Sequence, residues 1–427
     1  MSSSPSQPTS QPTSGPTAPP RQYDIVVYGA TGFVGRLLAA DLAEHAPQGT
    51  RIALAGRSRR RLSAARDGLP PAARAWPLIV ADASHTDEVQ ALAASTRVVV
   101  TTVGPYARYG LPLARACAEA GTDCADLTGE VLYVRDVADS CHEAAVASGA
   151  RLVTSCGFDS VPSDLAAWML YRRAKIDAAG GLADTTLLVT RMRGGVSGGT
   201  VDSMRAQLEA VSADPARRKV VFDPFGLSPD RAADPSKEAT VAHRDLMVPF
   251  RDEATGQWTA PFVMAPYNTR IVRRSDALLG HAYGPQFRYR EAMAFGTGPR
   301  ARATAYGLTA GLGLGMAAMG NAVTRPVADR LLPSPGDGPD EEARRTGRFR
   351  METRTTTTSG RRYVATVAAK GDPGYAATAV MLGESALSLA LDPRASGGGV
   401  LTPAVALGGA LVERLRARGF TMTVEPE

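Results

Sequence analysis

The sequence predicts an α/β protein in which a doubly wound parallel sheet is followed by a second α+β domain with a mixed or antiparallel sheet. The first observation is that, from Tyr23 on, short apolar runs alternate with segments of helical periodicity, as in parallel strands joined by crossover helices. The second is that this alternation stops after Gly157 and gives way to longer, less regular segments. The 427 residues suffice for two domains, each with its own apolar core.

Short apolar runs define six strands in the first domain, and five helices connect them. The helices are expected to begin near Phe33, Arg59, Thr86, Gly110 and Val131. The predicted strands are Asp24 to Tyr28, Arg51 to Ala55, Trp76 to Ala81, Arg97 to Thr102, Asp123 to Asp126 and Arg151 to Thr154.

The second half of the chain is less regular, and residues 212–300 give no readable pattern. Arg348 to Ala369 is typical of a β-hairpin that turns at Ser359 and Gly360, and Leu332 to Thr346 is predicted to be a loop. Further expected elements are helices over Ser163 to Lys175, Thr200 to Val211 and Pro403 to Arg418, and strands over Thr185 to Arg193 and Thr421 to Val424.

The change of pattern sets the expected domain boundaries. The first domain is predicted to span residues 23–160, the α+β domain 161–398, and a C-terminal helix and strand 399–427. Residues 1–22 are dominated by Ser, Pro, Thr and Gln, with neither a basic start nor an apolar core, so a disordered tail is expected and a signal peptide is not.

Composition excludes several classes of function. The formal net charge is +6, but the basic residues are scattered and form no stripe, so no nucleic-acid partner is expected. The four cysteines show no CxxC spacing and no paired histidines, so neither a metal site nor a disulfide framework is indicated. These features predict a cytoplasmic protein.

The strongest motif runs from Gly29 to Gly35, between the first predicted strand and the first helix. Glycines at this place allow a tight turn and close approach of backbone N–H groups to a diphosphate, which the positive end of the helix dipole also attracts. The motif therefore predicts a dinucleotide-binding Rossmann domain. The residues expected to contact the cofactor are Gly29, Ala30, Thr31, Gly32, Phe33, Val34 and Gly35.

The end of the second strand indicates which dinucleotide is bound. An acidic residue there would bind the ribose 2′-hydroxyl of NAD, but the chain has Arg57 and Ser58. A guanidinium group forms a charge-assisted fork with a 2′-phosphate, so NADP(H) is the expected cofactor. Asp82, just past the third strand, is expected either at the adenine or as a helix cap.

The turn after the fourth strand is directed at the nicotinamide half of the cofactor. Val103, Gly104 and Pro105 are expected cofactor contacts there, since a glycine permits close approach. Tyr106 is a candidate catalytic donor, with a buried structural tyrosine as the alternative.

Six runs in order along the chain resemble the saccharopine dehydrogenase-like oxidoreductases: GATGFVG, AGRS, TTVGPY, DLTGE (126–130), GFDSVPSD (157–164) and SGGT (197–200). The chain is most similar to the branch of trans-acting enoyl reductases, which serve polyketide synthases in the synthesis of wall lipids and glycolipids. The resemblance implies a second domain whose sheet faces the nicotinamide and a C-terminal helix that packs back towards the first domain. It also implies an acyl or polyketide substrate carried by a synthase.

Reduction of an enoyl thioester develops an enolate that needs stabilisation and then a proton. Ser197 and Thr200 lie at a turn that opens a helix, and Asp159 and Ser160 follow the sixth strand, so all four are candidate catalytic residues, with helix caps as the alternative. A competing hypothesis is a short-chain-type carbonyl reductase that uses Tyr171 and Lys175, which match the YxxxK spacing. An NADP-binding scaffold without catalysis is the third.

Ala303 to Val323 carries no charge over a length close to the ~20 residues that span a bilayer. A buried helix, a peripheral contact with the plasma membrane and a true span all remain open for this stretch. The sequence also leaves a homodimer open.

Overall fold

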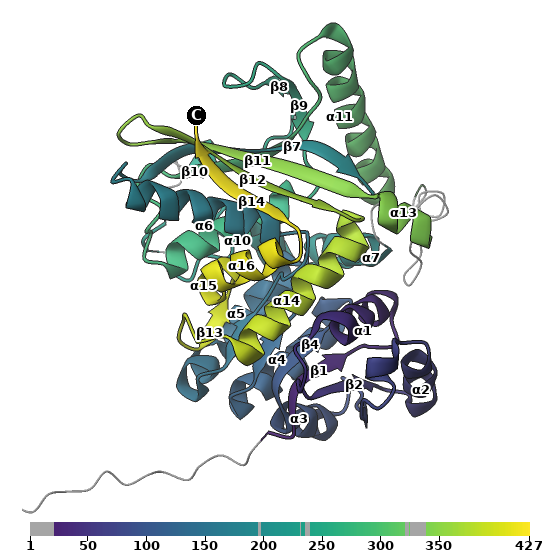
Figure 1. Ribbon diagram of the computed structural model, residues 1–427. Helices are drawn as coiled ribbons and strands as arrows, with labels where there is room; N and C mark the ends of the chain where they lie inside the picture. Colours follow the sequence, from purple (N-terminus) through teal and green to yellow (C-terminus); the bar gives the residue numbers. More distant parts are fainter. Residues whose placement is uncertain (1–20, 195–197, 231, 235–239, 321–323, 325–338) are drawn as a thin grey trace, which may run out of the picture.

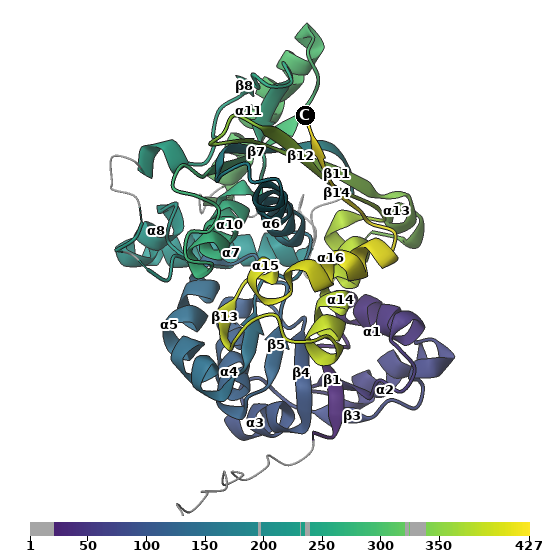
Figure 2. The same cartoon turned by 60° about the vertical axis from the view of Figure 1, so that its left-hand side comes forward.

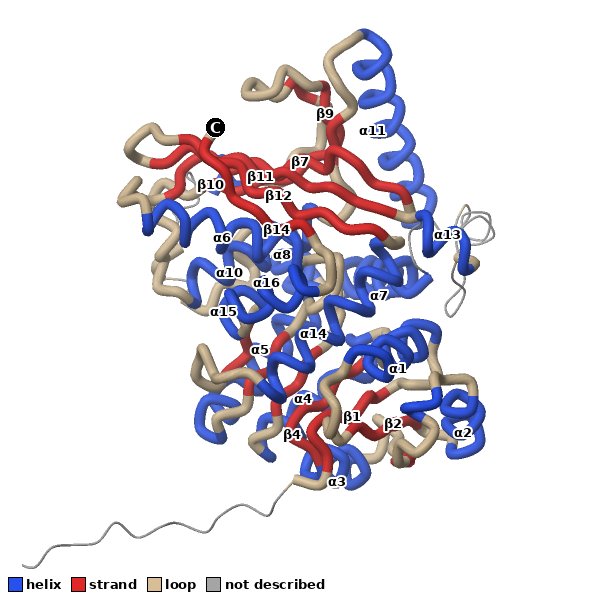
Figure 3. The backbone as a smooth tube through the Cα atoms, viewed as in Figure 1, coloured by secondary structure: helices blue, strands red, loops and turns tan. Residues whose placement is uncertain are grey.

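The computed structural model describes residues 21–194, 198–230, 232–234, 240–320, 324 and 339–427. Two seven-stranded sheets lie one above the other with helices between them (Figures 1 and 3). The lower sheet is sheet A and the upper sheet is sheet B. The predicted fold class, a parallel doubly wound sheet plus a second domain with a mixed sheet, is confirmed.

Sheet A is parallel throughout, in the order β13-β6-β5-β4-β1-β2-β3. The chain reverses its direction of winding at β1, between β2 and β4, which is where dinucleotide-binding sheets place their ligand. Its strands are β1 (Tyr23–Tyr28), β2 (Ile52–Gly56), β3 (Leu78–Val80), β4 (Thr96–Thr101), β5 (Asp123–Ala125), β6 (Arg151–Val153) and β13 (Gly399–Leu401).

Helices cover both faces of sheet A (Figure 2). One face packs on α3 (Thr86–Ser95), α4 (Tyr106–Ala120) and α5 (Val131–Ser148), and the other on α1 (Phe33–His45) and α14 (Thr378–Leu391). The helix α2 (Arg59–Asp67) and the turn η1 (Pro71–Ala73) complete the periphery. The predicted helix near Gly110 begins four residues earlier, at Tyr106, because Pro105 occupies the N-cap position.

The helix α14 and the strand β13 are parts of sheet A's layer that the sequence reading missed. They come from the C-terminal third of the chain, yet α14 packs on β1, β4 and β5, and β13 pairs with β6. Among the described residues, Pro373–Leu391 is the one helical stretch long and apolar enough to cross a membrane, and most of it is buried in this protein core. The apolar character of α14 therefore reflects its packing between sheet A and other helices of the protein.

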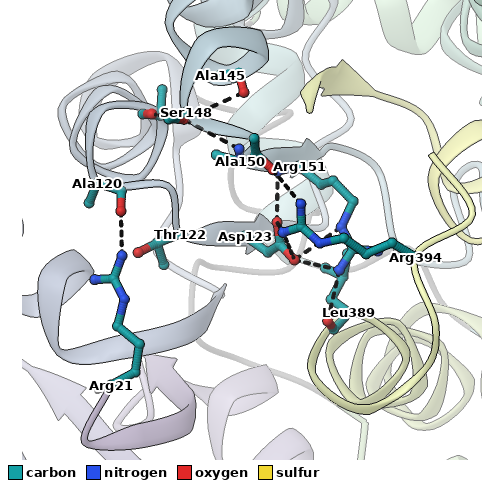
Figure 4. Close-up of polar contacts among 12 residues, drawn as sticks. Arg21, Ala120, Thr122, Asp123, Ala145, Ser148, Ala150, Arg151, Leu389 and Arg394 are labelled. Atoms are coloured by element: carbon teal, nitrogen blue, oxygen red, sulfur yellow. Dashed lines mark hydrogen bonds and ion pairs between the residues drawn. The ribbon is translucent and has the colours of Figure 1, made fainter. Parts of the chain in front are cut away.

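A buried ion pair fixes α14 to the sheet at the amino ends of β5 and β6 (Figure 4). The Arg151 guanidinium donates to the Asp123 carboxylate from Nε at 3.0 Å and to the Leu389 carbonyl at 2.8 Å, while Arg394 approaches Asp123 at 3.2 Å. Two arginines share one buried carboxylate, which satisfies its lone pairs. The C-terminal third of the chain is thereby tied to the first sheet.

Sheet B is mixed, in the order β14-β12-β11-β7-β10-β9-β8, and only β10 and β7 are parallel neighbours. The predicted hairpin is present as β11 and β12. The strands are β7 (Leu182–Arg193), β8 (Phe250–Arg251), β9 (Trp258–Pro261), β10 (Arg288–Ala294), β11 (Arg348–Thr357), β12 (Arg362–Lys370) and β14 (Thr421–Pro426).

Among the described residues, the helices that cover the central strands of sheet B lie on one face. The side chains of Phe349, Met351 and Thr353 alternate with exposed residues along β11, as expected for a sheet with one wet face. The covering helices are α6 (Val161–Ile176), α10 (Ala265–Leu278) and α16 (Gly408–Ala417). The helix α11 (Pro299–Gly320) rises past the end of β9 (Figure 1).

Several predictions about the second half need correction. The predicted loop Leu332 to Thr346 contains α13 (Glu341–Thr346), where Asp340 caps the helix by accepting from Ala343 N. The predicted helix Pro403 to Arg418 is broken at Leu407 into α15 (Pro403–Ala406) and α16. Residues 212–300 contain α8 (Pro215–Phe222), η2 (Val241–His243), β8, β9, α10 and β10. The residues after 398 supply one strand to each sheet, and the domain boundaries themselves stay predictions.

Candidate functional site

The glycine turn between β1 and α1 needs its glycines for the fold itself. Gly29 has φ +92°, and a Cβ there would lie 2.7 Å from Thr102 Oγ1. A Cβ on Gly35 would overlap the carbonyl group of Gly29. These contacts hold the start of α1 close to the end of β1. Because its N-cap residue, Gly32, offers no side chain, the positive end of α1 is open to an anion.

Gly104 is different, because the protein around it leaves room for a side chain. The atoms nearest to a Cβ at this position belong to the Tyr106 ring, 3.9 Å away, and Gly104 is exposed. The fold therefore does not require glycine here. The geometry instead favours close approach of a ligand to the turn after β4 as the reason for a glycine at this position.

The corner beyond β2 and β3 holds the predicted 2′-phosphate residues. Arg57 is exposed directly after β2. Ser58 caps α2 by accepting from Arg61 N at 3.4 Å. Asp82 accepts from the backbone N–H and the hydroxyl of Ser84, which holds the pKa of this carboxyl below its usual value. The N-cap of α3 is His85, so Asp82 shapes the preceding turn rather than capping that helix.

Glu130, which the sequence reading did not single out, organises the edge between β4 and β5. Its carboxylate accepts from the backbone N–H groups of Tyr106 at 2.9 Å and Ala107 at 2.7 Å, and from Ser203 Oγ at 2.7 Å. Ser203 belongs to α7 (Gly198–Ala213), so the carboxylate joins the start of α4 to the second domain. A negative charge at a helix N-terminus is favourable, which explains the position of this glutamate.

Asp126, from the same DLTGE run, is turned into the protein. It accepts from Thr128 N at 3.0 Å and Ser155 N at 2.9 Å, and burial raises its pKa to about 6. These bonds hold the ends of β5 and β6 together. Asp126 thus positions the loops that carry Gly129 and Asp159.

Asp159 is the predicted catalytic residue with the most suitable environment. Its Oδ2 lies 3.4 Å from the place of a Cβ on Gly129, beyond the carboxyl ends of β5 and β6. No hydrogen bond or ion pair holds its carboxyl group among the residues that the structure describes, and the residue is partly exposed. Burial of the carboxyl raises its pKa to about 7. At neutral pH this carboxyl is therefore able both to give and to take a proton.

Comparisons with known proteins decide the family. A model of the saccharopine dehydrogenase NADP binding domain matches residues 25–153. A putative trans-acting enoyl reductase of Mycobacterium tuberculosis (strain ATCC 25618 / H37Rv) is 50% identical over 415 residues, covering 94% of this chain and 97% of the relative. A trans-acting enoyl reductase of Mycobacterium ulcerans (strain Agy99) is 48% identical and covers 94% of this chain and 98% of its own.

The chain belongs to the trans-acting enoyl reductase family. It is an oxidoreductase with an NADP-binding domain, as the resemblance and the glycine turn predicted. The matched range runs from within β1 to the end of β6 and so includes every strand of sheet A except β13.

Solved structures agree on the fold of this enoyl reductase relative. A saccharopine dehydrogenase (L-Glu forming) from Saccharomyces cerevisiae has a TM-score of 0.55 at 11% identity and covers 94% of this chain and 99% of its own. A homospermidine synthase from Legionella pneumophila in complex with NAD has a TM-score of 0.50 at 10% identity, with coverage of 95% and 92%. At such identities the likeness shows the fold alone.

Two other candidate catalytic residues of this enoyl reductase homologue use their hydroxyl groups in hydrogen bonds within the protein. Tyr106 is buried and donates from its hydroxyl to the Thr101 carbonyl at 3.0 Å. Ser160 is buried and donates to Asn268 Oδ1 at 3.3 Å. The bond of Tyr106 favours its structural alternative. Ser160 is the N-cap residue of α6, but its side chain makes no capping hydrogen bond. Ser197 and the side chain of Thr200 lie outside the described residues.

The YxxxK pair lies in the second domain, towards the end of α6. Lys175 donates to the Tyr171 hydroxyl at 3.4 Å on the exposed surface, and the Tyr171 ring packs 5.4 Å from that of Tyr283. Since α6 packs against sheet B, the pair is separate from the glycine turn of sheet A. The geometry gives the short-chain hypothesis no support.

The GFDSVPSD run has a structural role, because its last residue joins distant parts of the chain. Asp164 accepts from Ser275 Oγ at 2.5 Å and from Ala404 N at 2.8 Å, and Ser275 also bonds Thr402 at 2.6 Å. Burial raises the pKa of Asp164 to about 7. The run thus meets the LTPA segment (401–404) at α10, which joins three distant parts of the chain. In the parts of the chain described, no group of three or more potential metal ligands comes together.

Proposed function

We propose that the protein is an NADPH-dependent enoyl reductase that acts on thioesters of lipid or polyketide acyl chains in wall-lipid or glycolipid synthesis. The observation that carries this proposal is 48–50% identity over 94% of the chain to proteins named trans-acting enoyl reductase. The open N-terminus of α1 and the exposed Arg57 support it, because they suit the diphosphate and the 2′-phosphate of NADPH.

When bound, the cofactor supplies a hydride for the β-carbon of the enoyl group. The protein must hold the substrate at the carboxyl edge of sheet A and manage the enolate that develops. Ser197 and Thr200 remain the proposed donors to the enolate oxygen.

Asp159 is the proposed proton donor. Its O–H bond breaks as the α-carbon gains a C–H bond, and the carboxylate that remains takes a proton from water, which reaches the partly exposed side chain. The absence of a fixed partner among the described residues leaves the carboxyl free for this exchange. A pKa of about 7 matches the task, because proton transfer is most efficient when the pKa lies near the working pH.

Apolar surface on β7 supports an acyl substrate. Met192 is 37% exposed and lies opposite Phe349, whose ring packs 4.8 Å from that of Phe158, the residue before Asp159. Such surface suits a hydrocarbon chain better than a polar amino acid.

Isotope labelling tests this function. Purified protein with NADPH deuterated at C4 and an enoyl thioester is expected to give a product with deuterium at the β-carbon, and a reaction in D₂O is expected to label the α-carbon. Oxidation of NADPH by a ketone substrate alone, with no enoyl reduction, would contradict the proposal and favour a carbonyl reductase.

The helix α11 is the proposed contact with a lipid surface. Leu314 is 73% exposed and Met316 41%, and the helix carries no charge after Arg302. We propose a cytoplasmic protein that touches the plasma membrane through this helix, with a homodimer as its assembly. In a flotation assay, wild-type protein is expected to rise with lipid vesicles, whereas the Leu314→Glu variant is expected to stay behind. Equal flotation of the two proteins would exclude the contact.

A further inference from the structure

Cationic side chains gather at one end of sheet B. Arg193, Arg348 and Lys370 stand directly opposite one another across β7, β11 and β12. One step along the strands, Arg191 faces Arg350 in the same way. All five residues are exposed. We call them the cation row.

The cation row is unfavourable for the sheet itself. Directly opposed residues on antiparallel strands are about 5 Å apart, and like charges at that distance repel each other. Glu352 pairs with Arg350 at 2.8 Å, but in the part of the chain that the structure describes no acid lies within ion-pair distance of Arg191, Arg193, Arg348 or Lys370. An anion outside the fold would offset this repulsion.

Some other cations on sheet B are paired with acids. Arg288 on β10 makes a two-pronged pair with Asp184 at 2.8 Å, and Arg354 on β11 pairs with Glu352 and Glu427 at 2.8 and 3.0 Å. The unpaired arginines outside the row stand opposite uncharged residues, namely Thr186, Thr356 and Trp258. Directly opposed cations therefore distinguish the row from the rest of the sheet.

This end of the sheet adjoins the cofactor turn. Gly347 and Gly371, the neighbours of the row, are joined by a hydrogen bond of 2.8 Å, and the next residues lead into the turn η3 (Pro373–Ala377). From η3 the Tyr375 ring packs 4.9 Å from the Phe33 ring, and Arg344 of α13 stands over the same ring at 5.4 Å. Figure 1 shows α13 and the ends of β11 and β12 above α1. This end of sheet B therefore lies beside the start of α1, with the row's side chains on the face that the covering helices leave open.

We propose that the cation row binds the phosphate of the pantetheine arm that carries the acyl thioester. This inference rests on the proposed enoyl reductase function, since a thioester substrate reaches the site on such an arm. Arginine side chains bind phosphate oxygens through charge-assisted paired hydrogen bonds, and several cations on neighbouring strands suit such an anion at the surface. The phosphate is part of a diphosphate in coenzyme A and of a phosphodiester on a carrier protein, and both present negatively charged phosphate oxygens.

The test compares three enoyl thioesters, of coenzyme A, of phosphopantetheine and of pantetheine without phosphate, on wild-type protein and on the double variant Arg193→Gln/Arg348→Gln. Arg362→Gln, an exposed arginine at the other end of β12, is the matched control. Binding is measured by calorimetry and turnover by NADPH oxidation. NADPH affinity is expected to be the same in all three proteins, which shows that the variants are folded.

The double variant is expected to weaken binding and raise KM by about 10-fold for both phosphate-bearing thioesters, with kcat unchanged, as loss of charged hydrogen bonds suggests. The pantetheine thioester and the control variant are expected to show no change. A penalty confined to coenzyme A would assign the row to that carrier's nucleotide phosphates. An equal penalty with and without phosphate, or none, would overturn the proposal. Wild-type protein that binds the thioesters through the row but reduces none would instead refute the proposed function.

Discussion

The two sheets of this protein carry their chemistry in different ways. Sheet A is parallel and covered on both faces, so its candidate functional groups lie in the loops after its strands: the glycine turn after β1, Arg57 after β2 and Asp159 after β6. Sheet B is covered on one face, and its open face presents side chains from the strands themselves. Short sequence motifs can therefore describe a site of the kind at the edge of sheet A. A site on the open face of sheet B exists only once its strands are paired.

The largest expected effect concerns proton transfer at the edge of sheet A. Asp159→Asn is expected to lower kcat by a factor on the order of 10² to 10⁴, while NADPH affinity stays the same. Since the donor must be protonated and its pKa is about 7, wild-type kcat should fall as the pH rises through that value. The variant should lack this fall. The dependence of kcat on pH, measured for both proteins, tests Asp159 as the proton donor. Replacement of a residue with a purely structural role would not abolish the fall of kcat at high pH.

The next effect separates two glycines of sheet A. Gly35→Ala places a Cβ against the Gly29 carbonyl and is expected to cost about 1–3 kcal/mol of unfolding free energy, as overpacking does. Gly104→Ala, which meets no atom closer than 3.9 Å, is expected to keep the Tm and weaken NADPH binding. Thermal unfolding and fluorescence titration measure the two effects. Equal loss of stability in both variants would show that Gly104 also serves the fold.

A smaller effect tests the choice of cofactor. Arg57→Ala is expected to weaken NADPH binding by roughly 1 to 3 kcal/mol and NADH binding much less, because only NADPH carries the 2′-phosphate. Calorimetric titration of both nucleotides gives the difference. If both affinities fall alike, Arg57 does not read the phosphate.

The smallest effect is expected in sheet B's helices. Tyr171→Phe removes the hydroxyl that Lys175 contacts on the surface, and neither kcat nor KM should change measurably. Loss of reduction in steady-state assays would revive the short-chain mechanism and make α6, not the edge of sheet A, the catalytic element.

Sequence reasoning succeeded where structure is local. The six strands of the first domain and the starts of four of its helices lie within two residues of their predicted positions, because each depends on neighbouring residues. It missed β13 and α14, which join sheet A from more than two hundred residues away, and Glu130, whose partners lie on α4 and α7. A glutamate that ends a DLTGE run before a helix is the signal that was available for the last of these.

By itself, the sequence predicted the glycine turn and the arginine expected at a 2′-phosphate, since strand, glycine turn and helix are consecutive and their geometry follows from backbone sterics. Only the tertiary structure decided which polar side chains are free. Tyr106 and Ser160 are buried donors, the Asp159 carboxyl has no hydrogen-bond partner among the described residues, and scattered basic residues come together in the cation row. Burial and strand register, which join distant residues, set these outcomes.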